Sequence, residues 1–501
     1  MSRNQRSRGF LKGKSIPATL ARVVAEEEDS LADYYVFPER FVGPAMDLDD
    51  PRAVFVGPKG AGKSAILKMV TIRRQSDSGR VILVSPDDLS LNALTRLDSR
   101  TSPLAPVWDE RWLFKSLWDY VLTVEILRRE FPTGSGLLDK VLSLFASQKR
   151  RDVRSFLEES LGDDNRSLGL TGWVIKLFDQ VSVSVAAPGL SAAVGAKLRT
   201  DSTVPIQTVK IPLLDTLSTV VKQLPELVKH EYLVLIDDLD RYWNGSPQQK
   251  IFIAALFQSL RKLSRKPVKF IVALREGIFN SLTIEDSDKF RERICMVSWD
   301  ASSMQQMVES RIRFAFHSPN LNVWGQLFPR EAFPKLWNST ARKPREVLRL
   351  AYLCLGKAKE NGNDSVLEED IHHARRIFSE EKISDLDSEY GYRYRGIGQV
   401  VRMMAGWHKE FGRQGADDLA IAVAESIEKS HDGASYSWAR GYIDDPLGLV
   451  KILAELGVLR IKQSRTDSAR DWECETPIDI NDHCWFSVHP MYAPALGCIG
   501  D

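Results

Sequence analysis

The stretch RAVFVGPKGAGKS (52–64) decides the fold of this chain. It begins as a short apolar run, passes at Gly57 into a match to G-x-x-x-x-G-K-[ST], and continues as a helical pattern to about Arg74. An apolar run that ends in glycine is typical of a buried parallel strand. The three glycines allow a loop whose backbone N–H groups wrap around phosphate oxygens. The stretch therefore predicts a strand, a phosphate-binding loop and a helix, in that order.

Each residue of this loop has an expected role in binding ATP. Lys63 is expected to reach the β- and γ-phosphates, and the Ser64 hydroxyl is expected to be a ligand of Mg²⁺. The following helix presents the positive end of its dipole to the anion. The residues expected to contact the nucleotide are Gly57, Pro58, Lys59, Gly60, Ala61, Gly62, Lys63, Ser64 and Ala65.

A second motif, LVLIDDLDR (233–241), supplies the acidic part of the expected site. Its four apolar residues predict a buried strand, and the carboxylate at the end of that strand is expected beside the phosphate loop. Asp237 is expected to hold Mg²⁺ through water. Asp238 has the position of the catalytic acid that orients the attacking water. Because aspartate is shorter than the commoner glutamate, we expect slow turnover, or, as an alternative, nucleotide binding with little turnover.

Further apolar runs alternate with helical patterns along the chain. Strands that alternate with helices predict a parallel α/β sheet with right-handed crossovers. Besides the strand before the phosphate loop, the expected strands cover residues 81–85, 231–238, 268–275 and 293–299.

At 501 residues the chain is too long for one ordinary core, so added modules are expected. Residues 108–131 have helical spacing, and VSVSV (181–185) before a Pro-Gly turn indicates a hairpin. A helix is expected over 16–35, and helix, strand, polar loop and strand follow one another near the C-terminus. The expected parts are an N-terminal tail and helix (1–40), the ATPase core (41–100 and 205–300), an insertion with helices and a β-hairpin (101–204), a helical lid (301–394) and a winged-helix-like domain (395–501).

Five arginines are candidates for contact with the nucleotide. Arg275 ends a strand where a γ-phosphate sensor usually lies; the alternative is a salt bridge to a nearby acid. Arg291 and Arg293 precede the last strand, where ring-forming ATPases offer an arginine finger to the neighbouring subunit; a solvated helix end is the alternative. Arg342 and Arg345 open a helix of the expected lid and are candidates for a lid sensor.

Charge and cysteine content limit the function classes. Sixty-eight Lys+Arg balance sixty-seven Asp+Glu, so no net field holds nucleic acid non-specifically, although local basic patches are possible. Five cysteines, odd in number and mostly far apart, fit reduced thiols in a cytosol rather than a disulfide framework. The longest weakly polar stretch (173–196) contains charges and a proline, so no membrane helix is expected. We expect a cytoplasmic protein.

The two motifs resemble those of the STAND and KAP-like branch of prokaryotic P-loop ATPases, which belongs to the additional-strand class related to AAA+ proteins. The similarity lies in GPKGAGKSAIL (57–67) and LIDDLDR (235–241). In addition, FIVALREGIF (270–279) and SWDASSMQQMVESRI (298–312) look like an uncharacterised bacterial P-loop ATPase family within that branch. The resemblance covers roughly residues 30–360.

This resemblance implies an additional-strand P-loop core and specific roles for individual residues. Lys63, Ser64 and Asp237 take the nucleotide and metal roles, Asp238 the catalytic acid role, and Arg275 the sensor role. KAP proteins often carry membrane helices, and STAND proteins often fuse an effector domain to a repeat sensor, but neither feature is visible in this sequence. A separate effector polypeptide is therefore expected, which would suit a multi-gene bacterial system such as antiphage defence.

Three functional readings follow from the motifs. The leading one is an ATPase that acts as a switch or assembly factor: ATP closes the lid, drives self-association into a homo-oligomer, and presents a surface to a partner. The second is a nucleic-acid motor or loader that uses the winged helix. The third is a nucleotide-binding scaffold with little turnover. A small-molecule kinase is disfavoured, because such kinases lack the large insertion and the long helical C-terminus.

Overall fold

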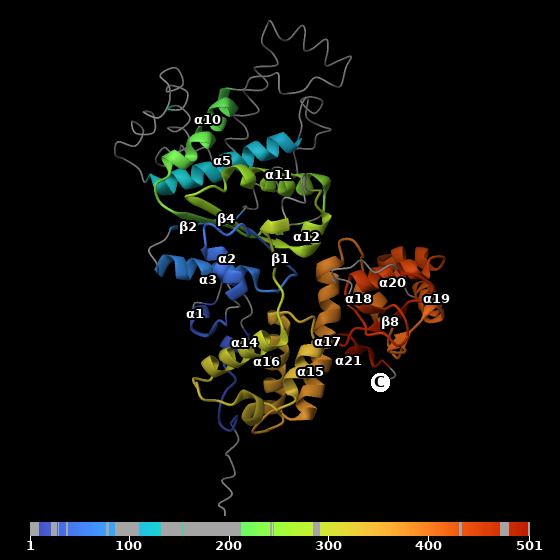
Figure 1. Cartoon of the computed structure of the whole chain (residues 1–501). Coiled ribbons are helices and arrows are strands. Elements are labelled where there is room, and N and C mark those ends of the chain that lie inside the picture. Colours follow the sequence, from blue (N-terminus) through green and yellow to red (C-terminus); the bar gives the residue numbers. More distant parts are fainter. Residues whose placement is uncertain are drawn as a thin grey trace, which may run out of the picture. The chain divides into compact units, whose positions relative to one another are not determined.

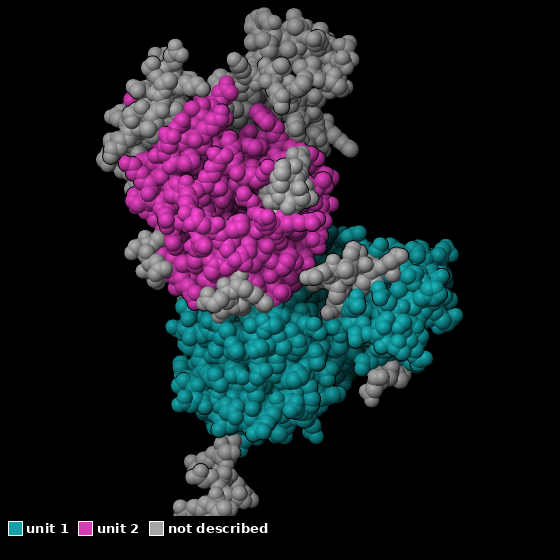
Figure 2. Space-filling model, in the orientation of Figure 1, with its two compact units in different colours: residues 1–36, 299–501 teal, residues 37–298 magenta. Residues whose placement is uncertain are grey.

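The structure is a computed structural model of the whole chain, organised in two compact units (Figure 2). One unit comprises residues 37–298, and the other comprises residues 1–36 together with 299–501. Each unit is treated by itself below. The structure describes residues 10–21, 28, 30–36, 39–76, 80–85, 110–131, 154, 212–240, 243, 245–283, 291–429, 433–470 and 480–498.

A five-stranded parallel sheet forms the centre of the 37–298 unit. Its strand order is β2-β3-β4-β1-β5, so β4 lies between the strand before the phosphate loop and the strand that carries the two aspartates. The predicted parallel α/β fold of the additional-strand type is confirmed. The strands are β1 (Val54–Gly57), β2 (Arg80–Val84), β3 (Tyr232–Ile236), β4 (Val268–Arg275) and β5 (Ile294–Met296).

Helices cover both faces of this sheet (Figure 1). On one face, α2 (Glu39–Met46) and α3 (Lys63–Ser76) pack on strand residues such as Phe55 and Leu235. On the other face, residues such as Val56 and Ile236 pack against three helices, α5 (Glu110–Glu130), α10 (Pro212–Leu227) and α11 (Pro247–Leu263). The strands are apolar on both faces, as expected for a parallel sheet between helical layers. A short helix, α12 (Glu276–Ser281), follows β4.

The predicted insertion contributes a helix to the core of this unit. The expected helix over 108–131 is α5, and its residue Trp118 donates a hydrogen bond from Nε1 to the Phe252 carbonyl of α11 at 3.0 Å. Buried contacts with α11 therefore fix α5 in place. The expected hairpin around 181–196 lies outside the described residues.

The N-terminal segment belongs to the other unit and does not form the single helix expected over 16–35. It has a 3-10 turn, η1 (Ala18–Ala21), and one helical turn, α1 (Leu31–Tyr34), whereas Glu28 between them is not helical. The physical reason is Arg311, a buried residue whose guanidinium binds the Glu28 carboxylate and the Thr19 carbonyl. These contacts hold the segment against α14 (Ala301–Ala315) instead of letting it continue as one helix.

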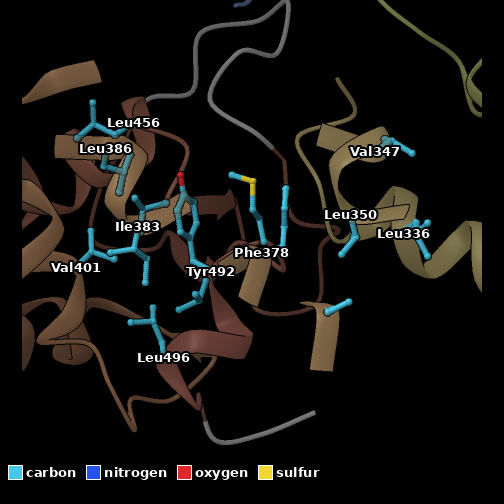
Figure 3. Packing of buried hydrophobic residues seen from close by; sticks show 14 of the residues in the cluster. Leu336, Val347, Leu350, Phe378, Ile383, Leu386, Val401, Leu456, Tyr492 and Leu496 are labelled. Carbon is cyan, nitrogen blue, oxygen red and sulfur yellow. The ribbon is translucent and has the colours of Figure 1, made fainter. Parts of the chain in front are cut away.

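Helices dominate the 299–394 part of this unit, as predicted. Leu336, Val347 and Leu350 lie in its core. Figure 3 shows Phe378 and Ile383 of α17 (Glu368–Tyr390) in the same buried cluster as Tyr492, which lies near the C-terminus. One continuous cluster of buried side chains therefore connects the helical part to the C-terminal part. The elements are α14 (Ala301–Ala315), a π-helical turn η5 (Val323–Leu327), α15 (Ala332–Asn338), α16 (Pro344–Glu360) and α17 (Glu368–Tyr390).

The C-terminal part has the topology of a winged helix, as the sequence predicts. Its three-stranded antiparallel sheet has the order β6-β8-β7, and two helices and a 3-10 segment separate β6 from β7. The polar loop between β7 and β8 is the wing. The elements are α18 (Ile397–Arg402), β6 (Glu410–Phe411), α19 (Arg413–Lys429), η6 (Gly433–Tyr442), α20 (Pro446–Glu455), β7 (Leu459–Lys462), β8 (Trp485–Val488) and α21 (Ala493–Leu496). Among the described residues of the chain, no helix has the length and apolar character needed to cross a membrane.

Candidate nucleotide-binding site

The strand register brings the predicted site residues to one edge of the sheet. Gly57 at the end of β1 is the register partner of Arg275 at the end of β4. Ile236, the last residue of β3, is paired with Val84 of β2 and with Val272 of β4. Because all five strands are parallel, their carboxyl ends share this edge, and ligands of open α/β sheets bind there.

The phosphate loop has the backbone conformation that its glycines allow. Gly60 and Gly62 have φ values of +83° and +95°, in the left-handed region. Gly57 is required for a different reason: a Cβ there would lie 2.9 Å from the Val297 carbonyl oxygen of the chain beyond β5. The loop thus passes too close to its neighbour, and turns too sharply, for larger residues at these three positions.

Lys63 lies at the first position of α3 and points back into the loop. Its Nζ donates hydrogen bonds to the Gly57 and Pro58 carbonyl oxygens at 2.8 and 2.9 Å. The ammonium is therefore held in the concave side of the loop by neutral acceptors, which a phosphate anion can replace with a stronger charge-assisted interaction. The first backbone N–H groups of α3 have no acceptor one turn earlier in their own helix, so they too are oriented toward an anion.

The two aspartates after β3 have distinct surroundings. Asp237 continues the strand pairing, since its N–H donates to the Val84 carbonyl at 3.2 Å. Asp238 turns the chain out of the sheet with a φ of +59°, and its N–H donates to Asp237 Oδ1 at 2.9 Å. The Ser85 hydroxyl donates to Asp238 Oδ2 at 3.0 Å. Ser85, which directly follows the neighbouring strand β2, thereby fixes the position of the Asp238 carboxylate.

Sequence reasoning did not single out Ser85. The residue is the last of the predicted strand 81–85, so its place at a strand end was readable from the sequence. Its contact with Asp238 depends on β2 being the neighbour of β3, which is a property of the strand order.

Arg275 makes the ion pair that was considered as its alternative role, and the sensor role stays a prediction. It ends β4 opposite Gly57 and is also the residue before α12. Its Nε lies 3.6 Å from Asp240 Oδ2, so the predicted alternative of a nearby acid is present. This ion pair places the guanidinium at the carboxyl edge of the sheet, on the β4 side of the phosphate loop.

Arg291 and Arg293 lie at the opposite edge of the sheet. They form the 3-10 turn η4 (Arg291–Arg293) before β5, and the Arg293 carbonyl accepts from the Ala53 N–H at 2.8 Å. From Ala53 to Gly57 the chain advances four residues of strand, roughly 13 Å. Neither arginine can therefore reach the phosphate loop of its own chain, so a role at a nucleotide requires a second subunit.

The lid candidates belong to the other unit. Arg342 has a φ of +59°, is exposed, and its Cζ lies 5.6 Å from the centre of the Trp337 ring. Arg345 is exposed in the first turn of α16, which begins at Pro344. Both roles stay predictions.

Comparisons with known proteins give one partial family match and distant relatives. Residues 302–387 match the FunZ-associated C-terminal helical domain. The chain is 22% identical over 435 residues to a putative transposon gamma-delta 80.3 kDa protein of Escherichia coli K12. That alignment covers 84% of this chain but 58% of the relative, so the chain spans little more than half the length of this protein.

The chain is also similar to solved structures at low identity. The Aeropyrum pernix ORC1 protein in complex with DNA has 13% identity and a TM-score of 0.38, covering 95% of this chain and 96% of that one. A Walker-type ATPase of Pyrococcus abyssi has 12% identity and a TM-score of 0.37, covering 93% and 96%. The strand order and the phosphate loop identify the P-loop fold independently of these global similarities.

Proposed function

We propose that this chain binds and hydrolyses ATP and acts as a nucleotide-dependent switch or assembly factor. The observation that carries the proposal is the common sheet edge that holds the phosphate loop, the Asp237–Asp238 turn and Arg275. Nucleotide phosphates, a metal and an attacking water all need to meet at one place, and this edge offers donors and acceptors for each.

The loop residues Gly57 to Ala65 would bind the phosphates through backbone N–H groups and the Lys63 ammonium. The donor set also fits Mg²⁺, since the Ser64 hydroxyl and the Asp237 carboxylate are the hard oxygen ligands that this ion prefers. When bound, Mg²⁺ neutralises charge on the β- and γ-phosphates. Among the residues of the chain, Ser64 at the start of α3 and Asp237 at the end of β3 would hold it.

Asp238 would orient the attacking water. Its carboxylate is anchored by Ser85, so it is held in one orientation before substrate arrives. The shorter side chain places the acceptor farther from the phosphate than a glutamate would, which fits slow turnover. Arg275 would sense the γ-phosphate by exchanging its Asp240 contact for the more highly charged anion.

Switching would proceed through self-association. Arg291 and Arg293 can serve only a neighbouring copy, which favours a homo-oligomer with shared sites. Arg342 and Arg345 would contact the bound nucleotide from the lid and so act as its sensor. The resemblance of the motifs to STAND and KAP-like ATPases favours a separate protein effector, and a bacterial multi-protein system such as antiphage defence is the setting we propose.

ATP turnover by purified protein tests the proposal, with molar mass by light scattering in the presence and absence of ATP. Lys63→Ala and Asp238→Ala should each abolish turnover, and Lys63→Ala should also abolish ATP-dependent assembly. Lys68→Ala, which removes a lysine from the same helix one turn later, is the matched control. Failure of the wild type to bind ATP would refute the proposal, whereas tight binding without turnover would indicate the scaffold.

A nucleic-acid motor or loader is the second candidate, favoured by the winged-helix topology. Its wing begins with QSRTDSAR (463–470), in which Arg465 and Arg470 are the cations. Duplex DNA binding that weakens with salt and is lost in Arg465→Gln/Arg470→Gln would support this function. No binding at low salt would count against it.

A further inference from the structure

Aromatic and arginine side chains gather where the connection between α17 and α18 meets η6. The connection reads GYRYRG (391–396), with arginines and tyrosines in alternation. Tyr392 is 65% exposed, an unusual exposure for so large a ring. We define the aromatic–arginine patch as Tyr392, Arg393, Tyr394, Arg395, Trp438 and Tyr442.

Three rings of this patch, Tyr394, Trp438 and Tyr442, are ordered by contacts with one another. The Tyr394 and Trp438 ring centres are 4.9 Å apart, and those of Trp438 and Tyr442 are 6.3 Å apart in an edge-to-face arrangement. Trp438 Nε1 donates to the Arg395 carbonyl at 2.9 Å, which ties the connection to η6. These three rings are therefore positioned before any ligand binds, so the connection that carries Tyr392 and the two arginines is anchored and less entropy is lost on binding.

The two arginines of the connection have no acidic partner among the described residues. Both are exposed, and the Arg393 Cζ lies 5.0 Å from the centre of the Tyr394 ring. Neighbouring arginines differ: Arg402 is paired with Glu380 at 2.6 Å, and Arg440 with Glu428 at 2.9 Å.

Acidic groups near the patch do not neutralise it. The Asp445 carboxylate accepts the Gly448 N–H as the cap of α20, and Asp444 is exposed beside it. Glu455 is close enough to contribute to the raised pKa of Tyr394, whose main cause is burial. The guanidinium groups of Arg393 and Arg395 thus remain available beside the exposed Tyr392 ring.

We propose that the aromatic–arginine patch binds single-stranded nucleic acid, with a base stacked on the exposed Tyr392 ring and phosphates at Arg393 and Arg395. Bases inside a duplex cannot offer a face to a protein ring, so an exposed ring flanked by arginines favours an unpaired strand. The site uses none of the wing residues, and it does not depend on ATP.

Fluorescence anisotropy with labelled oligo(dT) and oligo(U) of about twenty nucleotides, and with a duplex of equal length, tests the proposal. The full chain should bind the single strands more tightly than the duplex. Tyr392→Ala should weaken single-strand binding about tenfold, the usual loss for one stacked base. Tyr392 is exposed, so the variant should keep the wild-type circular dichroism spectrum. Tighter binding of oligo(dT) or of oligo(U) identifies DNA or RNA as the ligand.

Salt dependence isolates the phosphate contacts. Arg393→Gln/Arg395→Gln should reduce the slope of log affinity against log salt by about 1.4, since each phosphate contact with a single strand contributes about 0.7. Arg330→Gln/Arg376→Gln removes two exposed arginines outside the patch and is the matched control. Lys63→Ala should bind the oligomers as the wild type does, which separates this site from the nucleotide site. The proposal is overturned if the wild type binds neither oligomer at about 50 mM salt, or if Tyr392→Ala and the double variant both bind like the wild type.

Discussion

The two edges of the five-stranded sheet have different tasks. At the carboxyl edge, Lys63, Asp238 and Arg275 are held by short contacts with their immediate neighbours, in positions where an incoming anion and metal can displace or join them. At the amino edge, Lys269 binds backbone carbonyls and Arg52 pairs with Asp50, so these cations are used by the protein's own chain. The difference follows from parallel strands, which gather all their carboxyl ends, and the loops after them, on one side.

Lys269 shows the structural character of the amino edge. This residue, near the start of β4, is 3% exposed, and its Nζ donates to the Pro44, Asp47 and Asp50 carbonyl oxygens at 2.6, 2.5 and 2.8 Å. It thereby fixes the segment that leads from α2 into β1. Burial lowers the pKa of Lys269 to about 8. A cation here supports the chain that carries the phosphate loop, without approaching the loop itself.

The strongest test of this contrast concerns the two arginines of the amino edge. Arg291→Ala/Arg293→Ala should lower ATP turnover about 10³-fold, the lower end of the effect of an arginine finger, while ATP binding is retained. If these residues act on a neighbouring copy, mixing this variant with inactive Lys63→Ala should restore turnover. The intact site of the first protein then receives the arginines of the second.

Two results would argue against a role in ATP turnover for the arginines of the amino edge. Wild-type turnover in the double variant would show that the two arginines are solvated charges at the end of a helix, with no role at the nucleotide. Lost turnover that mixing does not restore would indicate a structural defect, which circular dichroism and thermal unfolding would reveal.

Arg275 tests the carboxyl edge. Arg275→Ala should lower turnover about 10²-fold, as expected when one donor to a developing negative charge is lost. Asp240→Asn removes the carboxylate but keeps the arginine, so it should leave most of the turnover. Equal losses in the two variants would show that the ion pair itself, and not the guanidinium, is what the site requires.

Most of the carboxyl edge could be predicted from the sequence because its residues are constrained by local chemistry. The glycines of the phosphate loop and the aspartates after an apolar strand are needed in a fixed order along the chain, so the strand, loop and helix around Gly57 were predicted with their types and approximate bounds. The winged helix was readable for a similar reason, since α20, β7 and β8 are consecutive along the chain.

Contacts between distant segments could not be predicted in this way. Ser85 meets Asp238 across 153 residues, and Lys269 meets Asp47 across 222, and both contacts depend on the strand order. Arg311 binds Glu28 across 283 residues, and this buried pair interrupts the helix that local apolar spacing predicted for the N-terminal segment. Local pattern carries no information about such partners.

Lys269, unlike the two arginines of the amino edge, should affect stability more than turnover. Lys269→Met leaves three buried carbonyls without their donor and should lower the free energy of unfolding at pH 7 by about 2 kcal/mol, measured by denaturant unfolding of the full chain. Lys266→Met, which removes an exposed lysine paired with Asp49, should cost much less.

The pH dependence of the free energy of unfolding is a second measure of the contribution of Lys269 to stability. Its pKa is about 8 in the folded chain and 10.5 without perturbation, so between these values the unfolded chain holds a proton that the folded chain has released. The contribution of this group to stability should therefore rise with pH across that window, with a limiting slope of about 1.4 kcal/mol per pH unit. Lys269→Met should lose this rise, and a variant that keeps it would assign the titration to another group.

The smallest expected effect belongs to Ser85, which acts through Asp238. Ser85→Ala removes one hydrogen bond to a carboxylate that the Asp237–Asp238 turn still directs toward the site, so turnover should fall about fivefold, equivalent to about 1 kcal/mol. Because Ser85 positions the acid and does not contact ATP in this scheme, the loss should appear in kcat with KM unchanged, and Ser85→Thr, which retains the hydroxyl, should restore it. In Asp238→Asn, Ser85→Ala should have no additional effect, since the residue that it positions no longer acts as an acid. Additive losses in the double variant would mean that Ser85 serves the site by a route other than Asp238, and the carboxyl edge would then contain a functional group that strand ends alone do not reveal.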